Sequence, residues 1–220
     1  MIPAGELPVG TTVQLNEDGK PKNYLIVNQG KPSEIYDDSC NGTWLLRENC
    51  IDKRSWDIEN KNKYEISDIY SWLDSEIVKK YDKLVQESVK QVKIPYRKNG
   101  GSGGNDQTGI NGILCKTFLL SGVEVGFDKE VYQYFPNDGS KLSFFEYGSG
   151  IGAARKRVSY FQDSPVNWCL RSPDISSANN VFYVQNNGFW FRGASSDEYG
   201  IRNAIVLGSD FLIEDKFVIS

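Results

Sequence analysis

The chain contains no histidine among its 220 residues. Histidine is the usual general base near neutral pH and a frequent metal ligand. Its absence excludes catalysis by Ser-His-Asp or Cys-His groups and every histidine-ligated metal site. Catalysis would therefore have to rest on carboxylates, lysine, tyrosine or an unassisted thiol.

Metal-binding or redox pairs of cysteines are also missing, because the four cysteines share no C-x-x-C spacing. We expect buried free thiols at Cys40, Cys50, Cys115 and Cys169. A bridge between Cys40 and Cys50 would close a short loop, but the expectation that the chain is not exported disfavours it. Without a histidine beside it, Cys169 is expected to be inert.

The chain has neither an excess of positive charge nor a long apolar run. Its formal net charge of −4 at pH 7 disfavours a nucleic-acid binder, because neutralising phosphates needs a basic face. We interpret the one basic cluster, Arg155-Lys156-Arg157, as solvated loop charge. A hydrophobic content of 39% without a bilayer-length run indicates a soluble protein with no membrane insertion. The start, MIPAGELPVG, lacks the pattern of a secretory signal.

Residues 1–57 are predicted to form an antiparallel β meander. Three short runs alternate apolar and polar residues, and turn signals separate them. The runs are TTVQL, NYLIVNQ and TWLLRE, and the turn signals are Asp18-Gly19, Gln29-Gly30 and Asn41-Gly42.

Residues 66–90 are predicted to be helical. Ser67 is a suitable N-cap, and Ile69, Trp72 and Leu73 follow with the spacing of one helix face. A second periodic set continues to about Lys90 with Tyr81, Leu84, Val85 and Val89. Extended structure is expected again around Pro95.

Residues 113–220 are predicted to be rich in short strands. The segment 113–127, ILCKTFLLSGVEVGF, has the composition of a buried strand. The glycine-rich segment 99–105 has the composition of a linker, but we interpret it as an exposed loop. Only one helical region exists to cover the sheet, so residues 1–220 are expected to share one core as a single domain.

The stretch from Trp168 to Leu207 has the composition of a recognition surface. Its short strands carry Val181, Tyr183, Phe189 and Phe191, and its turns display asparagine, arginine and aspartate. Aromatic and amide side chains supply contact area and adaptable hydrogen bonds at low entropic cost, and binding loops favour them for that reason.

A hairpin is expected around Asn187-Gly188, because Asn-Gly favours a tight primed turn. If strand alternation buries Phe189 and Phe191, then Trp190 and Arg192 point outward; the opposite phase exposes the two phenylalanines instead. Either phase leaves large aromatic rings facing solvent. The alternative is that another subunit, or the rest of the domain, covers them.

Two arginines are expected to act within the structure. Arg171 lies in a turn-rich motif, where a guanidinium usually binds backbone carbonyls or a carboxylate such as Glu124. The same interpretation applies to Arg202.

Three chemical motifs are considered and set aside. The glycine-rich segment from Tyr147 to Ala154 lacks the βαβ setting of a dinucleotide site and is interpreted as a flexible loop. Paired acids could hydrolyse glycosides, and oxygen donors could hold calcium, but neither set has a motif spacing. The acids are Asp37-Asp38, Asp128 with Glu130, and Asp197-Glu198; the oxygen donors are Asp174, Asn179, Asn180 and Asp197. No catalytic residue, cofactor or metal is predicted.

Four segments together resemble an uncharacterised family found in phages of gut Firmicutes and in surface-associated proteins of their hosts. They are KTFLLSGVEVGF (116–127), KLSFFEYGSGIGAARKRV (141–158), NWCLRSP (167–173) and YGIRNAIVL (199–207). ISDIYSWLDSEI (66–77) and VKIPYR (92–97) are similar to its helix and following strand, so the resemblance covers about Leu45 to Ile213. Cys169 stands where the family usually has an aromatic residue, and Asn203 where it usually has proline.

This family is similar to the C-type-lectin-like fold of formylglycine-generating enzymes and of the variable receptor-binding proteins of diversity-generating retroelements. The resemblance implies an α+β chain with small twisted antiparallel sheets, one or two helices and long ordered loops. It also implies that residues 168–207 face the ligand. Formylglycine-generating activity is not carried over, because Cys169 has no activating partner.

We therefore expect a phage virion protein at a tail tip or fibre, made in the bacterial cytoplasm and displayed on the particle. Its expected partners are a bacterial surface protein or glycan, other phage structural proteins and further copies of itself. The alternatives are a head-decoration or tail-assembly protein and, with less support, a carboxylate-dependent glycan hydrolase. The expected ligand-binding residues are Asn180, Asn186, Asn187, Phe189, Trp190, Arg192, Asp197 and Tyr199.

Overall fold

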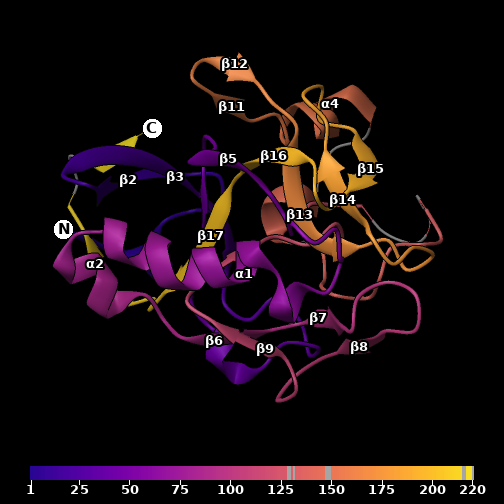
Figure 1. Ribbon diagram of the computed structural model, residues 1–220. Helices are drawn as coiled ribbons and strands as arrows, with labels where there is room; N and C mark the ends of the chain where they lie inside the picture. The colour runs from indigo at the N-terminus through magenta and orange to yellow at the C-terminus, as the bar shows by residue number, and fades with distance from the viewer. Residues whose placement is uncertain (128–129, 131, 147–149, 215–216, 220) are drawn as a thin grey trace.

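The computed structural model describes residues 1–127, 130, 132–146, 150–214 and 217–219 (Figure 1). The chain is 19% helical and 37% strand, and its strands lie in several small sheets. This agrees with the α+β class predicted from the sequence. Two of these sheets, named here the central and the distal sheet, position the candidate site.

The central sheet has the strand order β10-β17-β4-β3-β2-β19, and its neighbouring strands are antiparallel. The predicted meander forms β2, β3 and β4, and Asp18 and Gly19 both have the positive φ that a primed hairpin turn requires. Every residue of β4 and β17 is buried. The strands are β2 (Thr12–Glu17), β3 (Lys20–Gln29), β4 (Thr43–Arg47), β10 (Thr117–Leu119), β17 (Asn203–Leu207) and β19 (Val218–Ile219).

The distal sheet has the order β15-β14-β13-β16-β5, with β13 parallel to β16 and the other neighbours antiparallel. Figure 1 shows β15 at its outer border, on the right of the view. The regions 1–57 and 113–220 each supply strands to both sheets. The strands are β5 (Asp52–Ser55), β13 (Trp168–Pro173), β14 (Asn180–Val184), β15 (Trp190–Ala194) and β16 (Glu198–Ile201).

The remaining elements are short. Four strand pairs lie outside the two sheets: β1 (Ile2–Pro3) with β18 (Leu212–Ile213), β6 (Val92–Ile94) with β9 (Ile113–Cys115), β7 (Tyr96–Lys98) with β8 (Asn105–Gln107), and β11 (Tyr160–Phe161) with β12 (Ser164–Pro165). Two short helices, α3 (Ser143–Glu146) and α4 (Gly150–Arg155), precede the distal strands β13 to β16. The 3₁₀ turns are Ala4–Glu6, Asp38–Cys40, Tyr64–Ile66 and Val78–Lys80.

The predicted helical region lies at 68–88 but is divided. The Ser67 hydroxyl accepts a hydrogen bond from the Tyr70 amide at 3.2 Å, which confirms the predicted N-cap of α1 (Asp68–Trp72). The chain continues through a π turn, Leu73–Ile77, and is extended at Tyr81. Asp82 then caps α2 (Lys83–Ser88). The two periodic sets in the sequence therefore belong to two helices, because a second N-cap separates them.

The prediction of one strand over 113–127 was wrong. The segment forms β9 and β10, which pair with different strands, and residues 122–126 form turns. The Glu124 carboxylate accepts a hydrogen bond from the Ser121 amide at 2.8 Å. A Cβ atom on Gly122 would lie 2.4 Å from the Phe135 ring, so this turn is packed tightly into the core. The apolar composition reflects burial rather than extended structure.

The glycine-rich loop 99–105 is not simply exposed, because Gly100 and Gly101 are buried. A Cβ atom on Gly101 would lie 1.9 Å from the Ser177 carbonyl oxygen. The Gly101 amide also donates to the Asn62 side chain at 3.0 Å. The loop therefore packs against the turn that precedes β14.

The basic cluster 155–157 is only partly solvated. Arg155 is exposed, but Arg157 is buried and its Nε donates to the Val125 carbonyl at 2.6 Å. Its guanidinium lies 4.1 Å from the centroid of the Phe127 ring. Burial lowers the pKa of Arg157 to about 10. Interpreting the whole cluster as loop charge was wrong at this residue.

All four cysteines are buried and free, which confirms the expected thiols and excludes the Cys40–Cys50 bridge in this structure. Burial raises the pKa of Cys40 to about 12 and also raises that of Cys169. Within the described ranges, no helix combines the length and apolarity needed to cross a membrane.

Candidate functional site

The candidate site is built on the hairpin of β14 and β15, named here the ribbon. At its tip, the Gly188 amide donates to the Gln185 carbonyl at 2.8 Å, and the Gln185 amide donates to the Phe189 carbonyl at 2.7 Å. Within this loop only Gly188 has a positive φ, at 84°. The turn is therefore a three-residue loop with glycine in the left-handed position, not the predicted primed turn on Asn187-Gly188.

Packing against α4 explains this turn. A Cβ atom on Gly188 would lie 1.8 Å from the Ala154 carbonyl oxygen, so only glycine fits the contact. The sequence signal Asn-Gly correctly located the hairpin, but tertiary packing determined which residues form the turn.

The alternation of β15 takes the phase that exposes the phenylalanines. Phe189 is 47% exposed and Phe191 is 53% exposed, whereas Trp190 is half-buried. The Trp190 ring centroid lies 4.7 Å from that of Tyr132 and 5.5 Å from that of Phe135. The outward orientation considered for Trp190 is therefore wrong: its ring belongs to an aromatic cluster under the ribbon.

Arg192 lies on the same side of the ribbon as Trp190. Its Nη1 donates to the carboxylate of Asp174, which is completely buried, and its guanidinium lies 5.5 Å from the Tyr132 ring centroid. The hydrogen bond with Asp174 raises the pKa of Arg192. The side chain is 40% exposed, and its Nε and Nη2 make no hydrogen bond to the described residues. Arg192 is thus held in place while two of its nitrogens can still donate.

Tyr199 is not available as a binding residue, because only 5% of it is exposed. Its hydroxyl donates to the Ala194 carbonyl at 3.1 Å and lies 3.5 Å from the Asp197 carboxylate. Its ring lies 4.8 Å from the half-buried ring of Tyr183. Burial raises the pKa of Tyr199. Tyr199 supports the outer side of the ribbon, while the exposed Asp197 can contact a partner.

The predicted asparagines also include both exposed residues and a residue that supports the ribbon. Asn186 and Asn187 are exposed at the tip of the ribbon, where the Asn187 side-chain oxygen accepts from the Phe189 amide at 3.1 Å. Asn180 is half-buried, and its carbonyl accepts from the Asn62 side chain at 2.8 Å. Asn180 therefore anchors the base of the ribbon rather than its tip.

The structure thus distributes the predicted residues over two sides and a tip. The inner side carries Trp190 and Arg192, the outer side carries Phe189 and Asp197, and the tip carries Asn186 and Asn187. Phe191 and Tyr183 also lie on the outer side but were predicted only as strand residues. Tyr132 was missed completely: its segment is aromatic, but nothing in the sequence shows that it packs against β15. The predicted binding residues therefore do not share one side of the ribbon.

The interpretation of Arg171 as a structural residue is confirmed. Its two terminal nitrogens donate to the two oxygens of Glu124, each at 2.6 Å, and neither side chain is exposed. The other acceptors are the carbonyls of Pro95, Leu119 and Asp138. Arg202 is also structural, since its Nε donates to the Arg47 carbonyl at 2.7 Å and its guanidinium lies 5.1 Å from the Trp168 ring centroid.

Several of the oxygen donors and acids considered for metal binding or hydrolysis have local partners. Asp174 accepts from Ser176 on one oxygen and from Arg192 on the other. Asp37 caps a 3₁₀ turn, and Asp38 pairs with Lys31 at 2.9 Å. Asp128 and the start of the glycine-rich segment, residues 147–149, lie outside the described residues. The rest of that segment lies in α4, so its interpretation as a flexible loop was wrong there. In the part of the chain that the structure describes, no group of three or more cysteine or acidic residues could hold a metal ion.

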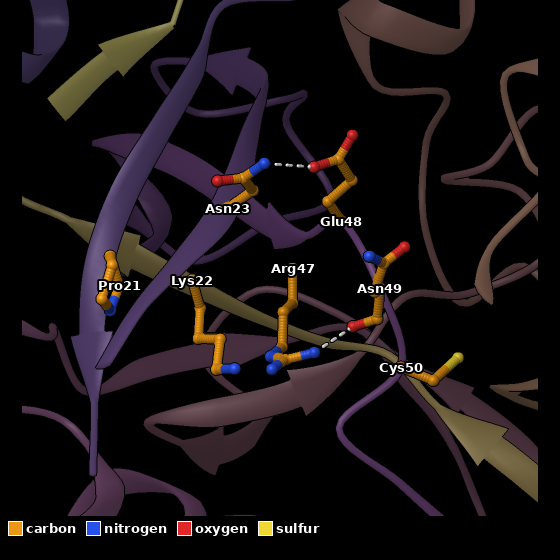
Figure 2. A pocket seen from close by; sticks show the side chains of 7 residues that line it. All are labelled: Pro21, Lys22, Asn23, Arg47, Glu48, Asn49 and Cys50. Carbon is orange, nitrogen blue, oxygen red and sulfur yellow. Dashed lines mark hydrogen bonds between the residues drawn. The ribbon is translucent and has the colours of Figure 1, made fainter. Parts of the chain in front are cut away.

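A separate pocket of about 310 Å³ lies beside β3 and β4, and Figure 2 shows the side chains that line it. The Arg47 guanidinium donates to the Asn49 carbonyl and, at 2.9 Å, to the buried Glu17. The Asn23 amide donates to Glu48 at 2.8 Å. The polar groups of Arg47, Asn23 and Glu48 in this pocket already have hydrogen-bond partners.

One comparison with known proteins gave a match. A family model with the description "Domain of unknown function (DUF6273)" matches residues 41–209. No curated protein and no solved structure matches the chain.

Proposed function

The chain belongs to the DUF6273 family, and from its own residues we propose that it is a binding protein that attaches a phage particle to a bacterial surface through the ribbon. We further propose that its fold is C-type-lectin-like. The mainly antiparallel sheets, in which only the described pair β13–β16 is parallel, the short helical region and the long ordered loops support that fold.

The main support for the proposal is the solvent exposure of the Phe189 and Phe191 rings. Both rings lie on the same side of a strand at the border of the distal sheet, and about half of each is open to solvent. Proteins usually protect a border strand with charge, proline or a covering segment. Neighbouring exposed aromatic rings at such a border are typical of an interaction surface.

The polar groups around these rings also favour recognition. Asn186 and Asn187 lie at the tip, Asp197 lies on the outer side, and Arg192 keeps unused donors on the inner side. Large rings with adaptable polar groups around them are the composition of binding surfaces. The rigid scaffold below, with Trp190 packed in the aromatic cluster and Arg171 buried in the core, limits the entropy that binding must remove.

The place of the protein in a tail tip or fibre is part of the same proposal. A single ribbon offers a small contact area, and such contacts are weak when they act alone. Display of several copies on one particle would convert them into firm attachment through avidity. Other phage structural proteins and further copies of the chain are the partners that such display requires.

The alternative role, as a head-decoration or tail-assembly protein, is favoured by one observation: a border strand can also pair with another virion subunit. The position of the ribbon in assembled particles separates the two roles. A ribbon that points outward supports attachment to the host, and a ribbon covered by neighbouring subunits supports assembly.

Retention on bacterial envelopes tests the proposed attachment. Labelled protein is incubated with envelope fractions from a panel of gut Firmicutes, and Phe191→Ser is compared with wild type. We expect wild type to be retained on at least one envelope and the variant to be retained at least tenfold less. Ile110→Ser is the matched control, because Ile110 is 69% exposed on a different loop. Equal retention of wild type and Phe191→Ser on every envelope would contradict the proposal.

A further inference from the structure

The outer edge of β15 has unpaired backbone groups. Residues of β14 and β15 pair in the register Tyr183 with Phe191 and Phe182 with Arg192. Hydrogen bonds join Gln185 to Phe189 at one end of the ladder and Ser195 to Asn179 at the other. In an antiparallel pair, hydrogen-bonded positions alternate. The amide and carbonyl groups of the intervening residues, Trp190, Arg192 and Ala194, therefore point away from β14.

Two of these three residues are open to a new partner. The Ala194 carbonyl already accepts hydrogen bonds from the Asp197 amide and the Tyr199 hydroxyl. In the described part of the chain, no hydrogen bond is made by the outward amide or carbonyl of Trp190 or Arg192. Their spacing of two residues is the spacing at which an added β-strand forms hydrogen bonds.

The side chains along this edge differ between its two sides. Phe189 and Phe191 present apolar surface on the outer side. On the inner side, Arg192 presents Nε and Nη2, which have no acceptor among the described residues. A strand lying along β15 would thus meet an apolar side at one residue and a cation at the next.

We propose that β15 is extended by a polypeptide partner, an extended segment that adds to the edge and alternates apolar and acidic side chains. The amide and carbonyl groups of Trp190 and Arg192 pair with the partner backbone. An apolar partner residue packs beside Phe191, and a carboxylate partner residue accepts from Arg192. This deepens the proposed function, on which it rests, by naming the ligand class as protein rather than glycan.

Two other occupants fit the edge less well. A glycan can stack on Phe191, but it has no regular row of backbone groups to satisfy the edge. A second copy of this chain, paired antiparallel about Phe191, would place Arg192 opposite Trp190 of the other copy. In that register the Arg192 guanidinium would face an aromatic ring, and its free nitrogens would have no carboxylate to bind. An acidic segment would supply that carboxylate.

Two substitutions at one residue test the backbone contribution. Arg192→Ala removes the guanidinium and keeps the outward amide; Arg192→Pro removes both, and proline is tolerated where a border-strand amide faces solvent. We expect retention on a binding envelope to fall a few-fold in Arg192→Ala and at least tenfold further in Arg192→Pro. Equal retention of the two variants would overturn the proposal. Circular dichroism and thermal melting check that both variants are folded.

If Arg192→Pro does not fold, amide hydrogen exchange of the wild-type chain tests whether a peptide pairs with the backbone of β15. The probe is an acetylated, alternating Val-Glu heptapeptide, and the matched control is the Val-Lys heptapeptide. We expect the Val-Glu peptide to slow exchange at the Trp190 and Arg192 amides at least fivefold, and the Val-Lys peptide to leave it unchanged. Unchanged exchange with both peptides would overturn the proposal.

Treatment of the envelopes separates this inference from the proposed function. We expect protease digestion of the envelope to abolish retention and periodate oxidation of glycans to leave it intact. The reverse pattern would overturn strand addition while leaving host attachment supported. Absence of retention on untreated envelopes, together with peptide-protected amides, would overturn attachment and support strand addition. Sedimentation equilibrium tests whether a second copy of the chain occupies the β15 edge. A wild-type dimer that is dissociated by Phe191→Ser would overturn the proposal.

Discussion

Two of the three arginines in the distal sheet, one on β13 and one on β15, each face a single buried carboxylate. Arg171 uses all three of its nitrogens, reaching Glu124 and three carbonyls, and has no exposed surface. Arg192 uses one nitrogen, mainly toward Asp174, and its side chain is 40% exposed. The same residue type is thus a fixed part of the core at the inner strand and an incompletely satisfied donor at the border.

The difference shows how this sheet separates stability from recognition. A buried guanidinium must have its donors satisfied, because an unpaired buried charge is strongly destabilising. At the border, water satisfies the remaining donors, so a partner can replace that water without disturbing the fold. Substitutions at the inner strand should therefore change stability, and substitutions at the border should change binding.

Removal of Arg171 is expected to have the largest effect on stability. Arg171→Met leaves the Glu124 carboxylate buried without its cation, so the free energy of unfolding should fall by about 3–5 kcal/mol. Urea denaturation measures the change. The double variant Arg171→Met/Glu124→Leu removes both charges and should recover at least half of the loss. A double variant as unstable as the single one would contradict the ion-pair explanation.

Asp138, which lies beside Arg171, should make stability depend on pH. Burial raises the pKa of Asp138 from its ordinary value to about 7, and one of its oxygens has no partner. The folded protein therefore keeps this proton at pH values where the unfolded chain has released it. The contribution of this group to the free energy of unfolding should fall by a few kcal/mol between about pH 4 and pH 7.

Asp138→Asn should remove that decline, because the amide does not titrate. Urea denaturation of wild type and variant at pH 4.5 and pH 8 measures the difference. We expect the variant to gain stability relative to wild type at pH 8 but not at pH 4.5. An unchanged wild-type slope in the variant would show that Asp138 does not cause it.

Trp190 and Phe191 are adjacent residues that should differ in their effect on stability. Trp190 packs in the aromatic cluster with Tyr132 and Phe135, so Trp190→Ala should lower the free energy of unfolding by about 2 kcal/mol. Phe191→Ala should change it by about 0.5 kcal/mol or less, because about half of that ring is already in solvent. Thermal or urea denaturation measures both. Equal losses would contradict the assigned strand phase.

Arg192→Ala is expected to have the smallest effect that remains measurable, about 1 kcal/mol or less. Asp174 is buried but the Arg192 side chain is 40% exposed, so truncation of Arg192 lets water reach the Asp174 carboxylate, and the Ser176 hydrogen bond to Asp174 remains. Urea denaturation at low and high salt measures it, with Arg192→Lys as the control that keeps the charge. A loss as large as that of Arg171→Met would remove the distinction between the inner strand and the border.

Features set by neighbouring residues were predictable from the sequence. The Ser67 cap and the Asp18-Gly19 turn depend on local hydrogen bonds and on backbone conformations that few residue types adopt. The Arg171–Glu124 pair was also predictable, because a guanidinium in a buried motif needs a carboxylate. These expectations needed only the preferences of single residues.

Apart from the Arg171–Glu124 pair, features set by contacts between distant segments were not predictable. The ribbon turn depends on the contact between Gly188 and Ala154, and the strand phase depends on the contact between Trp190 and Tyr132. A hydrophobic pattern cannot distinguish the two phases when both sides of the strand carry aromatic residues, as Phe189, Trp190 and Phe191 do here. The division of 113–127 had the same cause, since its apolar residues are buried in turns.

The pairing of β4 with β17 has a consequence for synthesis on the ribosome. β4 is translated long before its neighbour β17. Until β17 is translated, the apolar edge of the meander has no partner, and such nascent strands aggregate readily. Chains released before Asn203 should accumulate as insoluble material, and production should depend on a chaperone that holds the growing polypeptide.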